Sequence, residues 1–560
     1  MQKIFRVMII IAMLITAYLL ILAWRDDYAD APAVDTVPKT ATSVGADIPS
    51  TSGAAGDIPV QTLPVDTGAV AATPAGNTGL ITVTTDRYDI KINPEGGDIV
   101  YAALKQYDAT LDSDKPFVLL ENNSNRVYVA QSGLIGQNGI DTAEGRAKYS
   151  HAANNYVMEK GQQTLSVPLT YKKDGVTVTK TFTFTQDKYP IDISYQIQNA
   201  SANAWQGQMF AQLKRDDSKD PGMSDKGALS MATYLGGAWG TPDDPYNKLE
   251  FGKFNDGELT TTSDKGWVGI VQHYFVSAWT PENFTGKFFS RETGDEYFIG
   301  FNSQPVNVAP NKQVTLNATL YAGPKVQSEL KEVAVGLNQT VDYGLLWPIS
   351  KILFAVLDGI HKVIGNWGWS IILLTILVKI ALMWFSNKSY YSMAKMRAIA
   401  PRLAALKEEH GDDRMKMSQE MMAIYKEEKV NPMAGCLPIL MQMPIFLALY
   451  WVLVESVELR HAPWILWIRD LSAMDPWFIL PLLMGASMFV QQQLNPQPAD
   501  PMQAKVMKFL PIIFTAFMLF FPAGLVLYWT VNNLFSMTQQ YLINRKVEEE
   551  QKRRTVKVLD

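Results

Sequence analysis

Cysteine and histidine are scarce in this sequence, and no familiar catalytic motif occurs in it. Cys436 is the only cysteine and lies in an apolar stretch, so no disulfide can form within the chain. The histidines stand singly, which argues against a metal site; they are His151, His273, His361, His410 and His461. The motifs H-E-x-x-H, G-x-S-x-G and G-x-x-x-x-G-K-S/T are all missing. We therefore expect a protein that is not an enzyme and that uses neither a metal nor another cofactor.

Charge is also low, and it is unevenly distributed. Charged residues make up 19% of the 560 residues and the net charge is −5, so the balance gives no sign of nucleic-acid binding. Residues 28–335 have the texture of a soluble protein, whereas residues 340–545 are dense in Leu, Ile, Met, Phe and Trp. We predict a multi-domain membrane protein.

An uncharged run over positions 7–24 follows Lys3 and Arg6. Signal peptides have apolar cores of about 7–15 residues, and this run is longer. Ala29-Asp30-Ala31 resembles a cleavage site, but the length of the run favours an uncleaved transmembrane anchor over residues 1–27. Basic residues before the run and acidic residues after it predict a cytoplasmic N-terminus.

Two segments of opposite character follow the anchor. Residues 28–79 are rich in Ala, Pro, Thr, Gly and Ser, and we expect a flexible tether. Residues 80–335 alternate polar and apolar positions, with turn signals such as Pro94-Glu95-Gly96-Gly97 and Lys173-Asp174-Gly175 between the runs. This pattern predicts an antiparallel all-β domain in the form of a large sandwich.

Residues 345–366 form an amphipathic segment. Lys351, Asp358 and Lys362 fall on one face of a helix, and apolar residues cover the rest. With a tryptophan at each end, the segment is typical of a helix that lies in the membrane interface. A helix packed under the β domain is the alternative.

Five apolar spans follow, over residues 368–386, 434–455, 476–494, 508–522 and 524–543. Together they predict an all-α core of five transmembrane helices over residues 367–545. Lys and Arg are abundant in the segment 387–431 and in the basic tail 546–560, and they are sparse in the opposing loops. Because basic residues mark cytoplasmic loops, we expect both termini and the 387–431 segment in the cytoplasm, with residues 28–340 outside.

The cytoplasmic segment 387–431 has the pattern of a helical hairpin, whose turn is predicted at Gly411, Asp412 and Asp413. Both helices carry basic residues, such as Lys395 and Arg397, and a stripe of Met and Leu. One interpretation is a docking arm for a ribosome, a targeting factor or an emerging chain. The other is a solvated hairpin without a partner, and the sequence alone favours neither.

Lys379 places one ammonium group inside the first apolar span, where a charge costs roughly 2.5–3.5 kcal/mol. On a continuous helix, Thr375 and Asn387 share its face. No Asp or Glu occurs in the five spans apart from Glu455, at the opposite end. The alternative is that the long side chain of Lys379 extends its ammonium group to the membrane surface. The polar face and the missing counter-ion favour a cation in a wet recess that attracts anions from another molecule.

The other spans add polar and adaptable apolar side chains. The polar ones are Gln442, Thr515, Tyr528, Asn532 and Asn533. We expect Pro438 and Pro444 to bend or loosen the second span. An apolar surface for varied partners is predicted at Met441, Met443 and Phe446, although such residues more often face lipid or a core.

These residues resemble a known family. The stretches "GNWGWSIILLTILVK", "YYSMAKMR", "NPMAGCLPILMQMPIFLALYW" and "FPAGLVLYWTVNNL" are similar to the YidC-type membrane protein insertases of Gram-negative bacteria. The likeness covers essentially the whole chain, including the leading anchor and "NPEGGDIVYAAL" near the start of the β domain. It implies a periplasmic β-supersandwich domain and a five-helix core with a hydrophilic groove, open to the cytoplasm and to lipid.

The resemblance also assigns residues and partners. In the family a single basic residue, usually arginine, lies in the groove, and Lys379 occupies its position. Thr375 and Gln442 match polar groove residues, and we add Tyr528 and Asn532 to the predicted site. Trp529 stands where relatives often have a second tyrosine, so its role is left open.

The function implied is insertion of nascent membrane proteins into the inner membrane, alone or with the Sec translocon, and assistance with their folding. The implied partners are nascent chains, membrane lipids, the Sec translocon and a ribosome or signal recognition particle pathway, without direct nucleic-acid recognition.

Two other interpretations stay open at this point. A secondary transporter for an organic anion would use Lys379 as a ligand, but it should show an internal repeat, and we find none. A membrane-anchored sugar-binding or sugar-processing enzyme would fit a mutarotase-like sandwich, but fold analogy does not establish activity. That interpretation also leaves the five spans unexplained.

Overall fold

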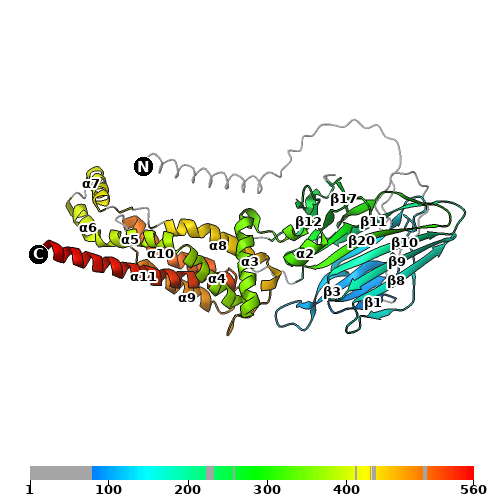
Figure 1. Cartoon of the computed structure of the whole chain (residues 1–560), viewed down its shortest axis with the longest axis horizontal. Helices are drawn as coiled ribbons and strands as arrows, with labels where there is room; N and C mark the ends of the chain where they lie inside the picture. The colour runs from blue at the N-terminus through cyan, green and yellow to red at the C-terminus, as the bar shows by residue number, and fades with distance from the viewer. Residues whose placement is uncertain are drawn as a thin grey trace, which may run out of the picture. The chain divides into compact units, whose positions relative to one another are not determined.

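The computed structural model describes residues 79–221, 233–255, 259–409, 413–428, 430–431, 435, 437–495 and 501–559. Within them, a β domain precedes a helical region (Figure 1). The predicted anchor over residues 1–27 lies outside the described residues, as does the tether up to residue 78.

Two large sheets make up the described part of the β domain. The first sheet has eleven strands, in the order β14 (Thr262–Ser263), β17 (Gly286–Thr293), β18 (Glu296–Ser303), β11 (Trp205–Asp216), β5 (Arg126–Ile135), β4 (Pro116–Asn123), β3 (Asp98–Asp108), β2 (Tyr88–Asn93), β1 (Ile81–Thr84) and β7 (Asn155–Val157), while β19 (Val306–Val308) pairs with β11. The second has nine, in the order β13 (Asn247–Leu249), β12 (Gly236–Gly240), β15 (Trp267–Val271), β16 (Phe275–Pro281), β20 (Lys312–Pro324), β10 (Pro190–Asn199), β9 (Val176–Thr185), β8 (Thr164–Lys173) and β6 (Ser150–His151). The predicted antiparallel pairing is found throughout these sheets except between β1 and β7, which run parallel.

Strand β9 shows why these residues form strands. Its even positions from Val178 to Phe184 point into the core and are buried, whereas the threonines between them are half-buried. The core positions face the same layer on both neighbours, since Phe182 pairs with Val167 of β8 and with Ile193 of β10. The alternation seen in the sequence is therefore the alternation between core and surface. One inward position, Lys180, is occupied by a charged residue.

The predicted turns lie at hairpin ends. Asp174 and Gly175 both have positive φ values, of 50° and 78°, between β8 and β9. Gly96 and Gly97 have φ values of 81° and 63° between β2 and β3. Asp174-Gly175 is a two-residue hairpin turn whose positive φ values match the twist of the flanking strands, whereas Gly96 and Gly97 are the last two residues of a four-residue connection, 94–97.

The helical region begins where β20 ends. Its elements are α2 (Gln327–Val333), η3 (Leu337–Thr340), η4 (Gly344–Leu346), α3 (Trp347–Ile364), α4 (Trp367–Ala381), α5 (Met383–Ala398), α6 (Ala400–Glu409), α7 (Arg414–Glu427), α8 (Leu437–Glu455), η6 (Val457–Leu459), α9 (Ile479–Gln493), α10 (Pro501–Met518) and α11 (Ala523–Leu559), and η2 (Phe251–Lys253) lies within the β domain. Helices therefore occur at each of the five predicted spans. The predicted basic tail is not a separate segment, because α11 continues through it to Leu559.

The first predicted span, 368–386, is broken. Helices α4 and α5 meet at Leu382 and are bent by 68° relative to each other. No proline or glycine lies at the break, so its position could not be predicted from local sequence. Lys379 lies two residues before the end of α4 at Ala381, close to the start of α5, which runs in a different direction.

By length and apolar composition, fewer helices qualify as membrane spans than the five that the sequence pattern predicts. Among the described residues, one helix passes alone, Gly344–Ile364, and the bent pair Trp367–Ala381 and Met383–Ala398 passes as a second if it is one span. Leu440–Glu455 is apolar but shorter.

Helix α3 is the predicted amphipathic helix. Figure 1 shows it running across the direction of α11 rather than alongside it. It contacts α4 and α8, and the Ser350 hydroxyl donates a hydrogen bond to the carbonyl oxygen of Ala448 over 3.0 Å. Large apolar side chains are left uncovered on its other sides, including Ile352 and Val363. The helix ends at Gly365, whose φ of 72° suits a left-handed C-cap.

Candidate functional site

Lys379 is buried between helices, as the cation hypothesis requires. Its side chain is 6% exposed, and Nζ donates a hydrogen bond to the Ser536 hydroxyl of α11 over 2.8 Å. Among the described residues, no carboxylate forms an ion pair with it. Glu455, the acidic residue noted in the spans, pairs instead with Lys325 at 2.9 Å. The lysine is therefore held by a neutral partner and has charge left to offer a ligand.

A second polar pair lies beside the same helix. Gln442 of α8 donates a hydrogen bond from Nε2 to the hydroxyl of Tyr528, which is 1% exposed. Tyr528, Asn532 and Ser536 follow one another at four-residue intervals on α11, so they share one side of it. Helix α11 thus brings together the predicted residues Gln442, Tyr528 and Asn532 with Lys379 through its contacts with α8 and α4.

A narrow recess opens beside Lys379. It is lined by Lys379, Leu382, Phe385, Ser386, Leu437, Pro438, Met441 and Gln442. It holds space for about one water molecule. The bend between α4 and α5 supplies one wall, and the first turns of α8 supply the other. The recess therefore joins a cation, a carboxamide and apolar side chains in one place.

Two predictions about the face of the first span change with the structure. Thr375 is buried, but its hydroxyl donates to the carbonyl oxygen of Ile371 at 2.7 Å, so its hydrogen bond stays within its own helix. Asn387 does not continue the face of Lys379, because the break at Leu382 redirects the chain. Its Oδ1 instead accepts a hydrogen bond from Gln539 over 2.8 Å.

The predicted apolar surface of α8 is divided. Met441 lines the recess and Met443 is 40% exposed, whereas Phe446 is 8% exposed and packs edge-on against Trp529. Phe446 is thus a core side chain and not a surface one. Apolar side chains are exposed on both α8 and α10: Leu437, Leu440, Met443, Leu447, Val506, Phe509, Leu510, Ile512, Ile513 and Phe517.

The role of Trp529 follows from its neighbours. Its ring lies 4.7 Å from that of Phe446 in α8 and 4.8 Å from that of Phe514 in α10. It therefore joins three helices by aromatic packing. Pro438 is the second residue of α8, where proline is tolerated, so that only Pro444 interrupts the interior of this helix.

The predicted hairpin contains a break that the sequence analysis missed. Its first helix ends at Ala398 and a new one, α6, begins at Ala400, just before Pro401. Asp413 caps α7, since its side chain accepts from the Lys416 backbone at 3.0 Å, while Gly411 and Asp412 lie outside the described residues. Part of the Met and Leu stripe, Met396, Leu403 and Leu406, packs within the hairpin around Ile399, Ile424 and Val430, whereas Met415 and Met422 are exposed. Lys395 lies over the ring of Tyr391 at 4.9 Å, and Arg397 is exposed.

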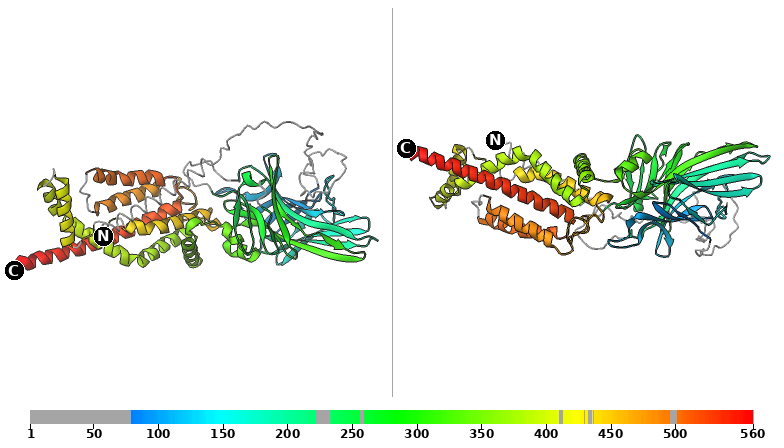
Figure 2. Two further views of the ribbon diagram at one scale, coloured as in Figure 1. Left: turned by 90° about the horizontal axis from the view of Figure 1, so that it is seen from above. Right: turned by 60° about the horizontal axis from the view of Figure 1, so that its bottom comes forward.

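Polar residues further along α11 were also missed. Ser536, Gln539, Gln540 and Asn544 are all buried, although the predicted site stopped at Asn532 and Asn533. A signal was present, because these residues recur every three or four positions and so fall on one side of a helix. Figure 2 shows α11 as the long red helix at the C-terminal end of the chain; α9 packs against it, and α10 packs against α9.

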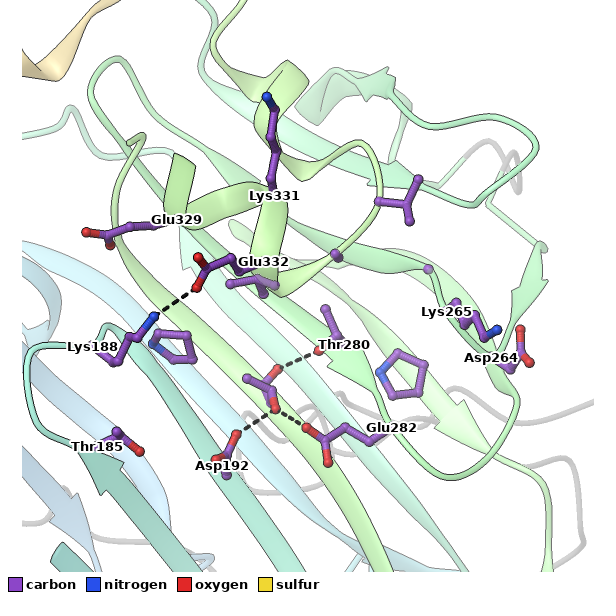
Figure 3. A pocket seen from close by; sticks show the side chains of 17 residues that line it. Thr185, Lys188, Asp192, Asp264, Lys265, Thr280, Glu282, Glu329, Lys331 and Glu332 are labelled. Carbon is purple, nitrogen blue, oxygen red and sulfur yellow. Dashed lines mark hydrogen bonds and ion pairs between the residues drawn. The ribbon is translucent and has the colours of Figure 1, made fainter. Parts of the chain in front are cut away.

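A larger cavity lies elsewhere in the described residues, in the β domain. It has a volume of about 620 Å³ and is bordered by strands β10, β16 and β20 and by α2 (Figure 3). Some of its charged side chains are engaged with their neighbours: Lys188 pairs with Glu332 at 2.8 Å, and the Thr319 hydroxyl donates to Asp192 and also meets Glu282. Cavity size alone therefore does not identify the site. The stronger candidate is Lys379, which is buried and has no carboxylate partner among the described residues.

Comparison with known proteins matches both halves of the chain. Residues 80–356 match the family model described as the YidC periplasmic domain, and residues 359–551 match that of the 60Kd inner membrane protein. The protein named membrane protein insertase YidC from Ectopseudomonas mendocina (strain ymp) is 48% identical over 571 residues, covering 97% of this chain and 98% of the relative. Its namesake from Pseudomonas syringae pv. syringae (strain B728a) is 50% identical over 569 residues, covering 98% and 99%.

A solved structure of an active YidC insertase is also similar. It is 17% identical, covers 83% of this chain and 93% of its own, and superposes with a TM-score of 0.37. The sequence relatives cover nearly the whole chain at about half identity, so they decide the assignment. The chain belongs to the YidC family of membrane protein insertases, with a β-rich periplasmic domain and a helical C-terminal region.

Proposed function

We propose that the polar site around Lys379 holds the hydrophilic flank of a nascent membrane protein while its apolar segment enters the inner membrane. The activity itself, insertion without a chemical reaction, follows from membership of the insertase family. The observation that carries the site assignment is the buried ammonium of Lys379, whose described partner is a neutral serine hydroxyl. A buried cation without a carboxylate has the strongest attraction for an anion brought by another chain.

The site acts by lowering the cost of dehydrating the flank. Acidic residues at the flank meet Lys379, and neutral polar groups meet Gln442, Tyr528 and Asn532. The membrane potential adds a driving force for moving negative charge outward, of about 2.3 kcal/mol per charge per 100 mV. Lysine supplies a point charge and lacks the planar fork of arginine, so the site attracts acidic flanks without clamping one carboxylate geometry.

The exposed apolar surface of α8 and α10 is the path for the apolar segment. Leu440 and Met443 on α8 lie close in sequence to Gln442, which lines the recess, so one client can touch both at once. Flexible Met and long aliphatic side chains adapt to different apolar sequences. The segment then leaves sideways into lipid.

The arrangement in the membrane is part of the proposal. In this proposal five helical spans follow α3, as the apolar runs predict. The loop charges place both termini in the cytoplasm. Residues 28–340 then form a periplasmic tether and supersandwich domain. A helix that lies in the interface explains why α3 runs across α11 and exposes Ile352 and Val363 on sides not covered by protein.

Partners are assigned by position and charge. The hairpin formed by α6 and α7 extends the basic cytoplasmic segment, with Arg397 exposed and Lys395 near it, and suits docking of a ribosome or a targeting factor. The periplasmic domain is the candidate surface for the Sec translocon. Relationship to insertases over nearly the whole chain does not support the transporter interpretation, and it leaves no reaction for a sugar-processing enzyme.

Lys379 variants test the proposed function. Lys379→Leu should leave a folded protein that inserts clients with acidic flanks poorly and clients with neutral flanks nearly normally. Lys379→Arg should work, because the charge is kept, and Lys379→Glu should be the most damaging, because it repels the flank. The measurement is insertion of paired clients in cells depleted of the wild-type protein, with variants at equal abundance. Full insertion of the acidic client by Lys379→Leu would assign the lysine to the membrane surface instead.

A further inference from the structure

The cytoplasmic half of α11 carries a series of buried carboxamides that extends well beyond Lys379. We call Asn532, Asn533, Gln539, Gln540 and Asn544 the amide stripe. They recur at intervals that keep them, with Ser536, on one side of the helix. Each is at most 8% exposed. From its first to its last residue the stripe runs about 18 Å, at 1.5 Å per residue.

Part of this hydrogen-bonding capacity joins helices. Asn533 Nδ2 donates to the Ser487 hydroxyl of α9 over 3.0 Å. Gln539 Nε2 donates to Asn387 Oδ1 of α5 over 2.8 Å. Gln540 Nε2 donates to Asn495 Oδ1, just after α9, over 2.9 Å. Bonds of this kind hold helices together where lipid offers no alternative partner.

The rest of the capacity is unused. Asn532 Oδ1, Gln539 Oε1, Gln540 Oε1 and Asn544 Nδ2 are buried and lack a hydrogen-bond partner. Asn532 and Asn544 make no side-chain hydrogen bond to any described residue. Buried polar groups are nearly always satisfied, and an orphaned one is costly. Helix packing therefore leaves one half of four of these carboxamides, those of Asn532, Gln539, Gln540 and Asn544, without a partner, and the open halves call for a ligand.

We propose that the amide stripe binds the peptide backbone of the client flank as it enters from the cytoplasm. An extended backbone presents an N–H donor and a C=O acceptor at every residue, whatever its sequence. Three free oxygens and one free N–H of the stripe complement such a chain. This deepens the proposed function and rests on it: Lys379 attracts the charge of a flank, and the stripe holds its backbone. Neutral flanks are then bound as well as acidic ones.

The position of the stripe fits a flank that enters from the cytoplasm and then reaches Lys379. Ser536, which bonds Lys379, lies among the stripe residues, and Asn544 lies just beyond the predicted end of the membrane span. A flank held along the stripe from Asn544 toward Asn532 therefore arrives beside Lys379. Binding through the backbone also suits a protein whose clients differ in sequence.

The test removes the unused amides and keeps the bonded ones. In Asn532→Leu/Asn544→Leu, no hydrogen bond between described residues is lost, so the melting temperature of the full-length protein should hold or rise. Insertion of a client with an uncharged Gly-Ser flank should nevertheless fall about three- to tenfold, the effect of losing one or two net hydrogen bonds. The same loss should appear with an acidic flank. Thr538→Val, on the exposed side of α11, is the matched control and should change neither quantity.

A proline flank separates backbone binding from other roles. Proline has no N–H to donate to Asn532 Oδ1, although its C=O still accepts, so Asn532→Leu should reduce insertion of a proline-flanked client less than that of the Gly-Ser client. Unchanged insertion of the Gly-Ser client by the double variant would overturn the proposal, as would a joint fall in melting temperature and insertion. An equal loss with the proline flank would also overturn it. If the stripe variants are silent while Lys379→Leu is selectively defective, only the stripe proposal fails; if Lys379→Leu is silent too, the proposed function fails with it.

Discussion

Lys180 is a fully buried lysine in the β domain, at an inward position of β9. Its ammonium donates hydrogen bonds to the carbonyl oxygens of Gly96 and Ser132, at 3.1 and 3.0 Å. Burial lowers the pKa of Lys180 to about 7, with a further lowering by Arg146, while Asp98 and Asp141 act in the opposite direction. The same two carbonyl oxygens also accept from Arg146, at 3.2 and 2.9 Å, so they would keep a partner without the lysine.

The lowered pKa predicts the pH dependence of the domain's stability. The unfolded chain protonates this lysine below a pKa of 10.5, whereas the folded chain does so only below about 7. The unfolded state thus binds more protons between these values, and the contribution of Lys180 to the free energy of unfolding rises as pH rises from about 7 toward 10.5. Below pH 7 the full penalty is present.

Lys180→Met should therefore stabilise the β domain at pH 7, by a few kcal/mol, and flatten its dependence on pH between 7 and 9. The measurement is the unfolding transition of the β domain in the full-length protein, followed by circular dichroism at several pH values. Lys172→Met, at an exposed position of the neighbouring strand, should leave the slope unchanged. A steeper slope in Lys180→Met than in the wild type would contradict the assignment.

At the scale of elements, the end of β20 is joined to the end of α8. Lys325 and Glu455 form an ion pair at 2.9 Å with side chains 2% and 5% exposed, and Lys325 also donates to the carbonyl oxygen of Thr340 at 3.1 Å. Nearby, His273 donates from Nε2 to the carbonyl oxygen of Val454 over 2.8 Å. Burial lowers the pKa of His273 to about 3, so the ring stays neutral when pH falls to 5.

Breaking the ion pair on one side should be costly. Glu455→Gln leaves the Lys325 charge buried without its counter-ion, and we expect a loss of about 3–5 kcal/mol. Lys325→Met/Glu455→Leu should recover most of that loss, because both charges are then gone. Thermal unfolding of the full-length protein measures both variants, with the exposed pair Arg545–Glu549 as control through Glu549→Gln. A double variant as unstable as the single one would show that packing, and not charge, holds the junction.

The helices and strands differ in how far the sequence predicts them. Alternation predicts β8, β9 and β10, and turn residues predict their hairpins, because core and surface positions are set by the pleat. Helices appear at all predicted spans because apolar runs of that length favour them. The break at Leu382 was missed, since it results from packing against other helices and not from a local helix breaker.

The sequence identifies Lys379 as a site residue, but it does not reveal which residue its ammonium group bonds. Lys379 stands out in the sequence because a charge in an apolar span is rare. Its partner Ser536 lies on α11, far away along the chain, and only the fold brings the two within 2.8 Å. Phe446 was placed wrongly on the surface, because an aromatic residue in an apolar helix has the same pattern whether it meets lipid or Trp529.

At the scale of the whole molecule, the charges of the loops predict the membrane topology. Cys436→Ser gives a cysteine-free chain, since Cys436 is the only cysteine, and single cysteines can then be added. A membrane-impermeant thiol reagent applied outside should label positions in 100–330 and 460–472, and it should miss 405–420 and 550. Labelling within 405–420 in intact, outer-membrane-permeabilised cells would invert the arrangement of the helical region.

We propose that a client's polar flank lies against the polar site around Lys379, Gln442 and Tyr528 while its apolar segment lies on α8. Site-specific photocrosslinking tests this directly, with the probe at Gln442 or Met443 and, as control, at Leu482, which is exposed on α9. Stalled nascent membrane proteins should crosslink from Gln442 through the flank and from Met443 through the apolar segment, with little from Leu482. Crosslinks from Leu482 alone, or equal crosslinks from all three positions, would contradict the claim.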